Sequence, residues 1–131
     1  MKRLLVIDDE PFVRDALKRV LEEDDLQVDV AADAETALVQ LNRQAYDLVI
    51  LDIIMPGMDG VELLRRVRAE FPGLRVIAIS GGGNFELGGY GPDAVTTRAY
   101  LAAAANVGAD AVLAKPFETA ELEALIRPLL Q

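Results

Sequence analysis

The stretch DLVILDIIMPGMDG, residues 47–60, decides the fold. Four consecutive large apolar residues, 48–51, lie between two aspartates and are followed by a Pro-Gly turn. A short apolar run of this kind is typical of a strand buried on both faces, at the centre of a parallel sheet. The strand ends in a carboxylate, Asp52, which we expect to face the following loop. A single aspartate at a strand end is more typical of a turn or a cap than of a reactive group, so the rest of the chain must decide its role.

Composition narrows the function classes. The 131 residues are 52% hydrophobic, enough for one domain with a full core. A formal net charge of −9 repels phosphate backbones and argues against direct nucleic-acid binding. The chain contains no Cys and no His, so chemistry must use carboxylates, lysines, hydroxyls or a metal that prefers oxygen. No segment is long and apolar enough for membrane insertion, and we expect a soluble cytoplasmic protein.

Apolar runs alternate with helical patterns along the whole chain. We predict strands at 3–7, 26–31, 48–52, 75–79 and 110–114. The first helix should begin at Pro11 and bury one face formed by Val13, Ala16, Leu17, Val20 and Leu21. The second helix should start after an N-cap at Asp33, and the third should span about 61–71. The fourth should end near Val107, with Gly108 at C′. The fifth should bury Leu122, Leu125, Ile126 and Leu129. In the last helix, Pro128 predicts a kink or an early end.

Such an alternation predicts an α/β fold: a three-layer α/β/α domain with a five-stranded parallel sheet. The strict polar alternation of 26–31 places that strand at an edge. In the order 2-1-3-4-5, ligands bind at the carboxyl ends of the strands, in the crevice between strands one and three. The reactive residues fall at those ends, since four of the five strands finish at Asp8-Asp9, Asp52, Ser80 and Lys115.

The chain resembles the receiver domain of two-component response regulators over essentially its whole length. The matching stretches are VIDDE at 6–10, DLVILD at 47–52 with MPGMDG at 55–60, IS at 79–80 and KPF at 115–117. Each stretch alone is weak evidence for the family. All of them together, in this order and at successive strand ends, are specific evidence for it. The resemblance implies one receiver domain over 1–131, of flavodoxin-like type, and no output domain. It also implies a cis peptide between Lys115 and Pro116.

The resemblance further implies that Asp52 accepts a phosphoryl group from a sensor histidine kinase or a histidine phosphotransfer protein. Three carboxylates in one crevice repel each other and favour a divalent cation. Because only oxygen ligands are available, Mg²⁺ is favoured, with Mn²⁺ as an alternative. By the family pattern the metal ligands are Asp9, Asp52 and the backbone carbonyl of Ile54, with Asp8 acting through water. Lys115 and the Ser80 hydroxyl would contact the phosphoryl oxygens.

Each of these residues also has a simpler interpretation. Asp8 and Asp9 are compatible with a solvated helix entry, Lys115 with a surface lysine, and Ser80 with the start of a turn. For Asp59 we favour an N-cap of the third helix. Glu10 should lie near the crevice rim without binding metal.

The sequence departs from the family at two places. The position of the usual switch aromatic, three residues before Lys115, is Val112. The glycine-rich loop 81–92 is longer than receivers usually carry. One hypothesis joins the two departures: Phe85 or Tyr90 supplies the missing aromatic in the active state, when the Ser80 hydroxyl moves towards the phosphoryl group. The alternative is a loop without that role.

The expected output is a contact with another protein. A downstream target or a homodimer would use the face formed by the fourth helix, the fifth strand and the fifth helix. We expect a signalling switch that assists its own phosphorylation and dephosphorylation, and not an enzyme with turnover. The alternatives are a degenerate receiver that acts as a phosphorylation-independent interaction module, an aspartyl phosphatase and a flavin binder. A phosphatase would need an acid two residues after its nucleophile, where this chain has Ile54.

Overall fold

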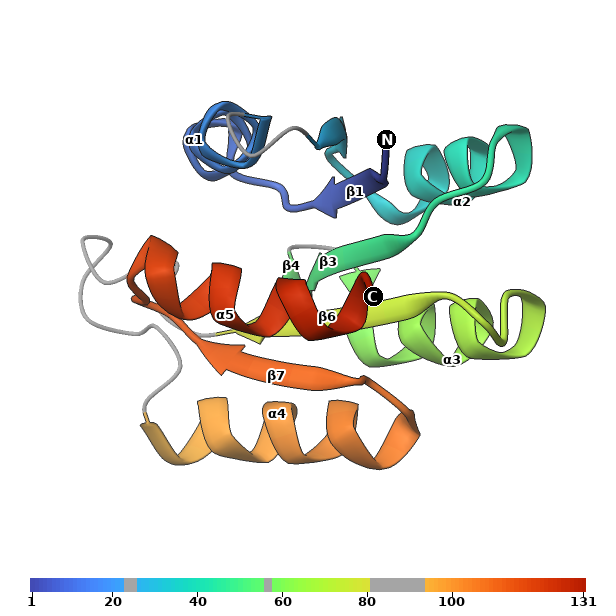
Figure 1. Cartoon of the computed structure of the whole chain (residues 1–131). Helices are drawn as coiled ribbons and strands as arrows, with labels where there is room; N and C mark the ends of the chain where they lie inside the picture. Colours follow the sequence, from blue (N-terminus) through green and yellow to red (C-terminus); the bar gives the residue numbers. More distant parts are fainter. Residues whose placement is uncertain (23–25, 56–57, 81–93) are drawn as a thin grey trace.

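The structure is a computed structural model, and it describes residues 1–22, 26–55, 58–80 and 94–131. Its main sheet has five parallel strands in the order β2-β1-β3-β6-β7, which is the predicted 2-1-3-4-5 topology (Figure 1). The strands of this sheet are β1 Arg3–Ile7, β2 Gln27–Ala31, β3 Leu48–Asp52, β6 Arg75–Ser80 and β7 Ala111–Ala114. The helices are α1 Pro11–Glu22, α2 Ala34–Arg43, α3 Gly60–Glu70, α4 Ala94–Val107 and α5 Thr119–Leu129.

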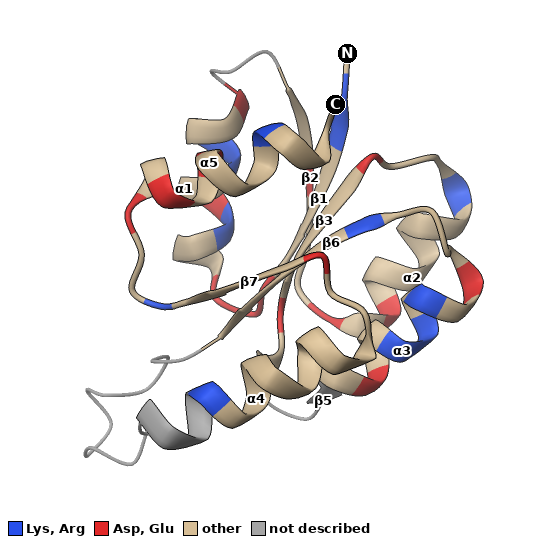
Figure 2. Cartoon of the chain, turned by 60° about the horizontal axis from the view of Figure 1, so that its bottom comes forward, with Lys and Arg blue, Asp and Glu red and all other residues tan. Residues whose placement is uncertain are grey.

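Two apolar layers cover the sheet, one on each face. One layer joins the sheet to α1 and α5, and the other joins it to α2, α3 and α4. Figure 2 shows these two groups of helices on opposite sides of the sheet. Successive residues of β3 alternate between the layers: Leu48 and Ile50 pack with the first, Val49 and Leu51 with the second. All of β3 is buried, as the continuous apolar run predicts for a central strand. The alternating strand β2 lies at the edge, as expected.

The predicted caps at Asp33 and Gly108 are present, and the apolar stripes are largely confirmed. The Asp33 carboxylate accepts the Thr36 N–H at 2.7 Å, as an N-cap does. On α5, Leu122 and Ile126 are buried while Leu125 and Leu129 are partly buried. The stripe of α1 is narrower than predicted, because Leu17 and Leu21 are buried but Ala16 is exposed.

One local prediction needs correction, and one pair of short strands was not predicted. Pro128 does not end α5 early, because the helix continues to Leu129 and the proline lies in its last turn. The connection between β3 and α3 also contains an unpredicted antiparallel pair, β4 Ile54–Met55 with β5 Met58–Asp59. Two-residue strands are too short to produce a recognisable alternation in the sequence. None of the helices in the described ranges is long and apolar enough to cross a membrane.

Gly108 follows the last residue of α4 and has a backbone conformation that residues with a side chain rarely adopt. Its φ is +124°, and its N–H donates to the carbonyl of Ala104 at 3.1 Å. A Cβ at this position would lie 2.9 Å from Cδ of Arg68 on α3. This confirms the C′ assignment and adds a packing reason for the glycine.

We therefore expect Gly108→Ala to lower the free energy of unfolding by about 1–2 kcal/mol, since an L-residue is strained in the left-handed region. Urea unfolding followed by circular dichroism measures the change. Gly73→Ala is the matched control, because no atom lies within 4 Å of a Cβ built there and its φ is not positive. Equal costs at the two positions would contradict this interpretation of Gly108.

Candidate functional site

Four strand ends meet at one edge of the sheet. Asp8 follows β1, Asp52 ends β3, Ser80 ends β6 and Lys115 follows β7. The strands are parallel and in register, with Asp52 opposite Ile79 and Ser80 opposite Ala114, so their carboxyl ends align. The Lys115 N–H donates to the Ser80 carbonyl at 2.8 Å, which ties the last two strand ends together. The peptide between Lys115 and Pro116 is cis, as predicted.

Three carboxylates converge at this edge. Asp8, Asp9 and Asp52 each place one oxygen within 4.8 Å of the others. Asp8 is fully buried and Asp52 is 3% exposed, while Asp9 is partly buried. Unpaired carboxylates are costly to bury, so this geometry requires neutralising charge nearby.

Lys115 supplies part of that charge. Its Nζ lies 3.0 Å from Oδ2 of Asp8 and 3.2 Å from Oδ2 of Asp52. Glu10, on the rim and 40% exposed, lies 3.8 Å from the same ammonium. Lys115 itself is mostly buried, so the interpretation as an exposed surface lysine is wrong.

Backbone amides hold the other oxygen of both buried acids. The Ile54 N–H donates to Oδ1 of Asp52 at 3.0 Å, and the Glu10 N–H donates to Oδ1 of Asp8 at 2.9 Å. Each carboxylate is thus fixed at one oxygen by the turn that follows its strand and at the other by Lys115. Arg14, which the sequence analysis did not single out, donates from Nη1 to the Asp8 carbonyl at 2.7 Å. Its only sequence signal is a cation on the first turns of α1.

The environment shifts two pKa values in the same direction. Burial raises the pKa of Asp52 to about 6, and the Asp8 charge adds to the rise, whereas Lys115 and the Ile54 N–H oppose it. Burial would lower the pKa of Lys115, but the Asp52 and Asp8 carboxylates outweigh it and raise that pKa. Lys115 therefore stays charged, and the acid cluster retains excess negative charge near neutral pH.

Ser80 adds an unsatisfied hydroxyl. Its side chain is fully buried, and Oγ has no hydrogen-bond partner among the described residues. A buried hydroxyl without a partner costs free energy, so its place at the edge that carries the acids is compatible with a site that binds a ligand. An all-oxygen acid set with a buried lysine and a free hydroxyl fits an oxygen-preferring cation together with an anion.

The remaining candidate residues are less defined. Val112 lies on β7 and is 37% exposed. Phe85, Tyr90 and the loop 81–92 lie outside the described residues, as does the Asp59 side chain. Ile54 is the first residue of β4 and is partly buried. The structure shows its backbone N–H donating to the Asp52 carboxylate.

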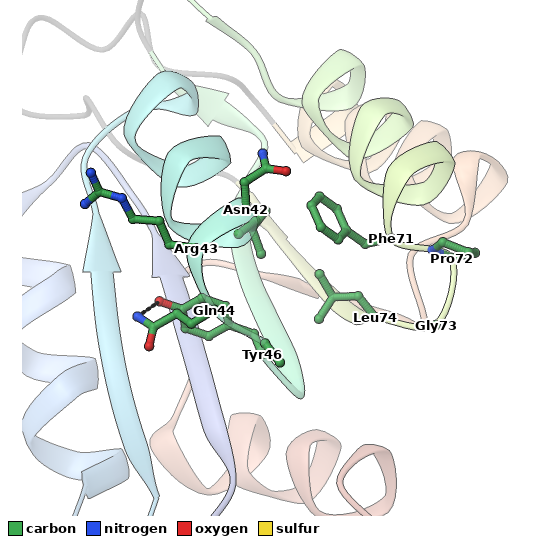
Figure 3. Close-up of a pocket in the computed structure, with 10 residues that line it drawn as sticks. Asn42, Arg43, Gln44, Tyr46, Phe71, Pro72, Gly73 and Leu74 are labelled. Atoms are coloured by element: carbon green, nitrogen blue, oxygen red, sulfur yellow. Dashed lines mark hydrogen bonds between the residues drawn. The ribbon is translucent and has the colours of Figure 1, made fainter.

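A separate hollow of about 520 Å³ lies between the ends of α2 and α3. Figure 3 shows Asn42 and Phe71 on its walls, and the Gln44 side-chain amide donates to the Tyr46 hydroxyl at 3.1 Å. None of its lining residues belongs to the acid cluster. The hollow contains no carboxylate and no primary amine, so we place the chemistry at the strand ends.

The raised pKa of Asp52 gives a pH-dependent stability. The folded state binds more protons than the unfolded state between pH 3.8 and about 6, so stability should fall as pH rises through this window. Without divalent cations, the stability advantage of Asp52→Asn over the wild type should grow from pH 4 to pH 7 by on the order of 2 kcal/mol. Urea unfolding of both proteins in chelator measures it. An advantage that does not change with pH would show that burial does not perturb Asp52.

Known proteins resemble this chain in sequence. The family model described as the response regulator receiver domain matches residues 4–88. Response regulator Rre1 of Synechocystis is 38% identical over 97% of this chain and 51% of its own length. Two-component response regulator PhoP of Pseudomonas aeruginosa is 33% identical over 98% of this chain and 52% of its own. The chain thus spans about half the length of these relatives.

Solved structures agree with the sequence comparison. A CheY-like receiver domain protein from Methanospirillum hungatei superposes with a TM-score of 0.82 at 29% identity, over 99% of this chain and 94% of that one. TrrA from Thermotoga maritima, crystallised in complex with Mg²⁺ and BeF, superposes with a TM-score of 0.76 at 33% identity, over 99% and 100%. With the sheet order and the strand-end residues, these matches show that the chain belongs to the response regulator receiver domain family of two-component systems.

Proposed function

We propose that this chain is a phosphoacceptor switch in a histidine–aspartate phosphorelay, with Asp52 as the acceptor. One observation carries the proposal: the Lys115 ammonium lies within 3.2 Å of both Asp52 and Asp8. The same sheet edge carries the Ser80 hydroxyl, which has no hydrogen-bond partner within the part of the chain that the structure describes. Receiver domains are signalling switches and not turnover enzymes, and residues 1–131 would form one such unit.

Asp52 is suited to act as the nucleophile. An ionised carboxylate carries no proton, so the transfer needs no general base, in agreement with a chain that has no histidine. In the proposed transfer, an Asp52 oxygen forms a bond to phosphorus while the phosphorus–nitrogen bond of a phosphohistidine breaks. The electron pair of that bond returns to the imidazole. The amide of Ile54, on Oδ1, keeps the carboxylate oriented.

The surrounding residues would hold the group after transfer. Lys115, already 3.2 Å from Asp52, would pair with one phosphoryl oxygen, and the Ser80 hydroxyl would donate to another. Catalysis of phosphoryl transfer consists mainly of positioning and charge neutralisation, and both side chains serve those ends.

The acid cluster fits Mg²⁺, with Mn²⁺ as an alternative. Among the described residues, the three carboxylates outnumber Lys115, which contacts two of them, and the available donors are oxygens. Asp9, Asp52 and the Ile54 carbonyl would hold the cation, with Asp8 acting through water. When bound, the cation neutralises charge on the phosphoryl oxygens.

The partners would be a sensor histidine kinase or a phosphotransfer protein on one side and a protein target on the other. The proposed target or homodimer face comprises α4, β7 and α5. Figure 2 shows α4 almost without charged residues, and Arg98 is the one charged residue within its bounds. The alternative of a degenerate receiver is less favoured, because the acids and the lysine are all present and in contact.

Incubation with Mg²⁺ and acetyl phosphate tests the acceptor directly. Intact mass spectrometry should show one added phosphoryl group that is stable in acid and labile in base. Asp52→Asn should remove it, whereas Asp15→Asn, an exposed acid on α1, should not. Equal labelling of Asp52→Asn and the wild type would contradict the assignment of Asp52.

Thermal unfolding tests the cation. Because Mg²⁺ should bind only the folded state, a concentration one hundred times its dissociation constant should add about 2.7 kcal/mol of stability. Asp9→Asn should remove most of this increment, since it deletes one charged ligand. Asp15→Asn serves again as the control, and an increment that survives Asp9→Asn would remove Asp9 from the ligand set.

A further inference from the structure

The first residue of α3, Gly60, is buried against the main chain of Ile53. A Cβ at Gly60 would lie 2.3 Å from Cα of Ile53, 2.5 Å from its carbonyl oxygen and 2.7 Å from its carbonyl carbon. All three are backbone atoms, so no change of side-chain rotamer can relieve the overlap. Any other residue at this position must move α3 or the segment that contains Ile53.

Ile53 is not free to move on its other side. Its N–H donates to the Ile79 carbonyl of β6 at 3.0 Å, one residue beyond the paired part of β3. Its side chain is 2% exposed and belongs to the apolar layer under α2, α3 and α4. The Ile53 backbone is therefore held between β6 and Gly60.

The next residue connects this contact to the reactive carboxylate. The Ile54 N–H donates to Oδ1 of Asp52 at 3.0 Å, and Ile54 pairs with Asp59, the residue before Gly60, in the β4–β5 pair. A displacement of Ile53 by a methyl group at Gly60 would move this amide away from Asp52. The Ile54 carbonyl, in the same short segment, would move with it.

We propose that Gly60 is a positioning residue of the site: its bare Cα allows the close approach of Ile53 that holds the Ile54 amide on the Asp52 carboxylate. The metal and phosphoryl consequences of this inference rest on the proposed function. The contact between the Ile54 amide and the Asp52 carboxylate does not depend on that function, and it can be tested separately.

The first test follows the Ile54 amide by ¹H–¹⁵N NMR in metal-free protein. In Gly60→Ala, the Ile54 amide proton should shift upfield as its bond to Asp52 is lost, while amides of β1 and β2 should keep their positions. Gly73→Ala, with open space around its Cβ, should leave the Ile54 resonance unchanged. The shift of the Ile54 resonance would then result from the lost contact with Ile53 and not from the loss of a glycine as such.

The second test measures Mg²⁺ alone by isothermal titration calorimetry. Disturbing a residue that orients metal ligands typically costs about tenfold or more in affinity, and we expect a loss of this size in Gly60→Ala but not in Gly73→Ala. A global loss of stability weakens the apparent affinity only through the fraction of molecules that is unfolded, so both variants are titrated under conditions in which circular dichroism shows them fully folded. The affinity therefore separates positioning from a merely structural role.

An Ile54 resonance and a Mg²⁺ affinity that match the wild type in Gly60→Ala would overturn the proposal. So would a Gly60→Ala protein that does not fold even in trimethylamine N-oxide, which favours the folded state, because Gly60 would then support the whole fold. Failure of the wild type to accept a phosphoryl group from acetyl phosphate would instead refute the proposed function and leave the NMR result on Gly60 standing.

Discussion

Two buried carboxylates, Asp8 and Asp52, share a single ammonium group, and the rest of the site depends on this arrangement. Lys115 bridges their Oδ2 atoms, and backbone amides of the following turns hold their Oδ1 atoms. With Asp9 close by, the negative charge exceeds what one lysine can neutralise. Burial raises the pKa of Asp52, the Asp8 charge adds to the rise, and a bound divalent cation would favour the ionised carboxylate.

Burial of the apolar sheet offsets the free-energy cost of burying these charges. The strands β1, β3 and β6 consist almost entirely of buried aliphatic residues, and their parallel direction brings Asp8, Asp52 and Ser80 to one edge. Burial of the sheet stabilises the fold, while its polar end carries three acids and a hydroxyl that is unpaired among the residues the structure describes. The proposed site thus lies where buried polar groups have the fewest partners, and a bound ligand would supply them.

Much of this organisation can be predicted from the sequence because it depends on local pattern. The apolar run 48–51 predicts the central strand, the alternation in 26–31 predicts an edge, and Asp33 and Gly108 predict helix ends. The residues at the strand ends then predict which side chains meet, since parallel strands place all their carboxyl ends at the same edge of the sheet. The roles of Asp52, Lys115 and Ser80 in chemistry stay predictions, although the structure brings the three residues to one edge.

The parts that the sequence does not reveal depend on tertiary distances. The Gly60–Ile53 contact, the Arg14 bond to the Asp8 carbonyl and the β4–β5 pair have no periodic signal. Ala16 fits the apolar stripe of α1, yet it is exposed because the buried part of that helix is narrower than the pattern. Pro128 lies in the last turn of α5, so the one backbone hydrogen bond that it removes leaves the preceding turns of the helix intact.

The coupling between cation and carboxylate is tested most directly by the protons released when Mg²⁺ binds. Calorimetric titrations at pH 6 and pH 8, each in buffers with different ionisation enthalpies, give the number of protons released per cation. With the pKa of Asp52 at about 6, we expect about half a proton at pH 6 and almost none at pH 8. Binding without proton release at pH 6, or no binding at all, would contradict an acid cluster held in an unbalanced state for a cation.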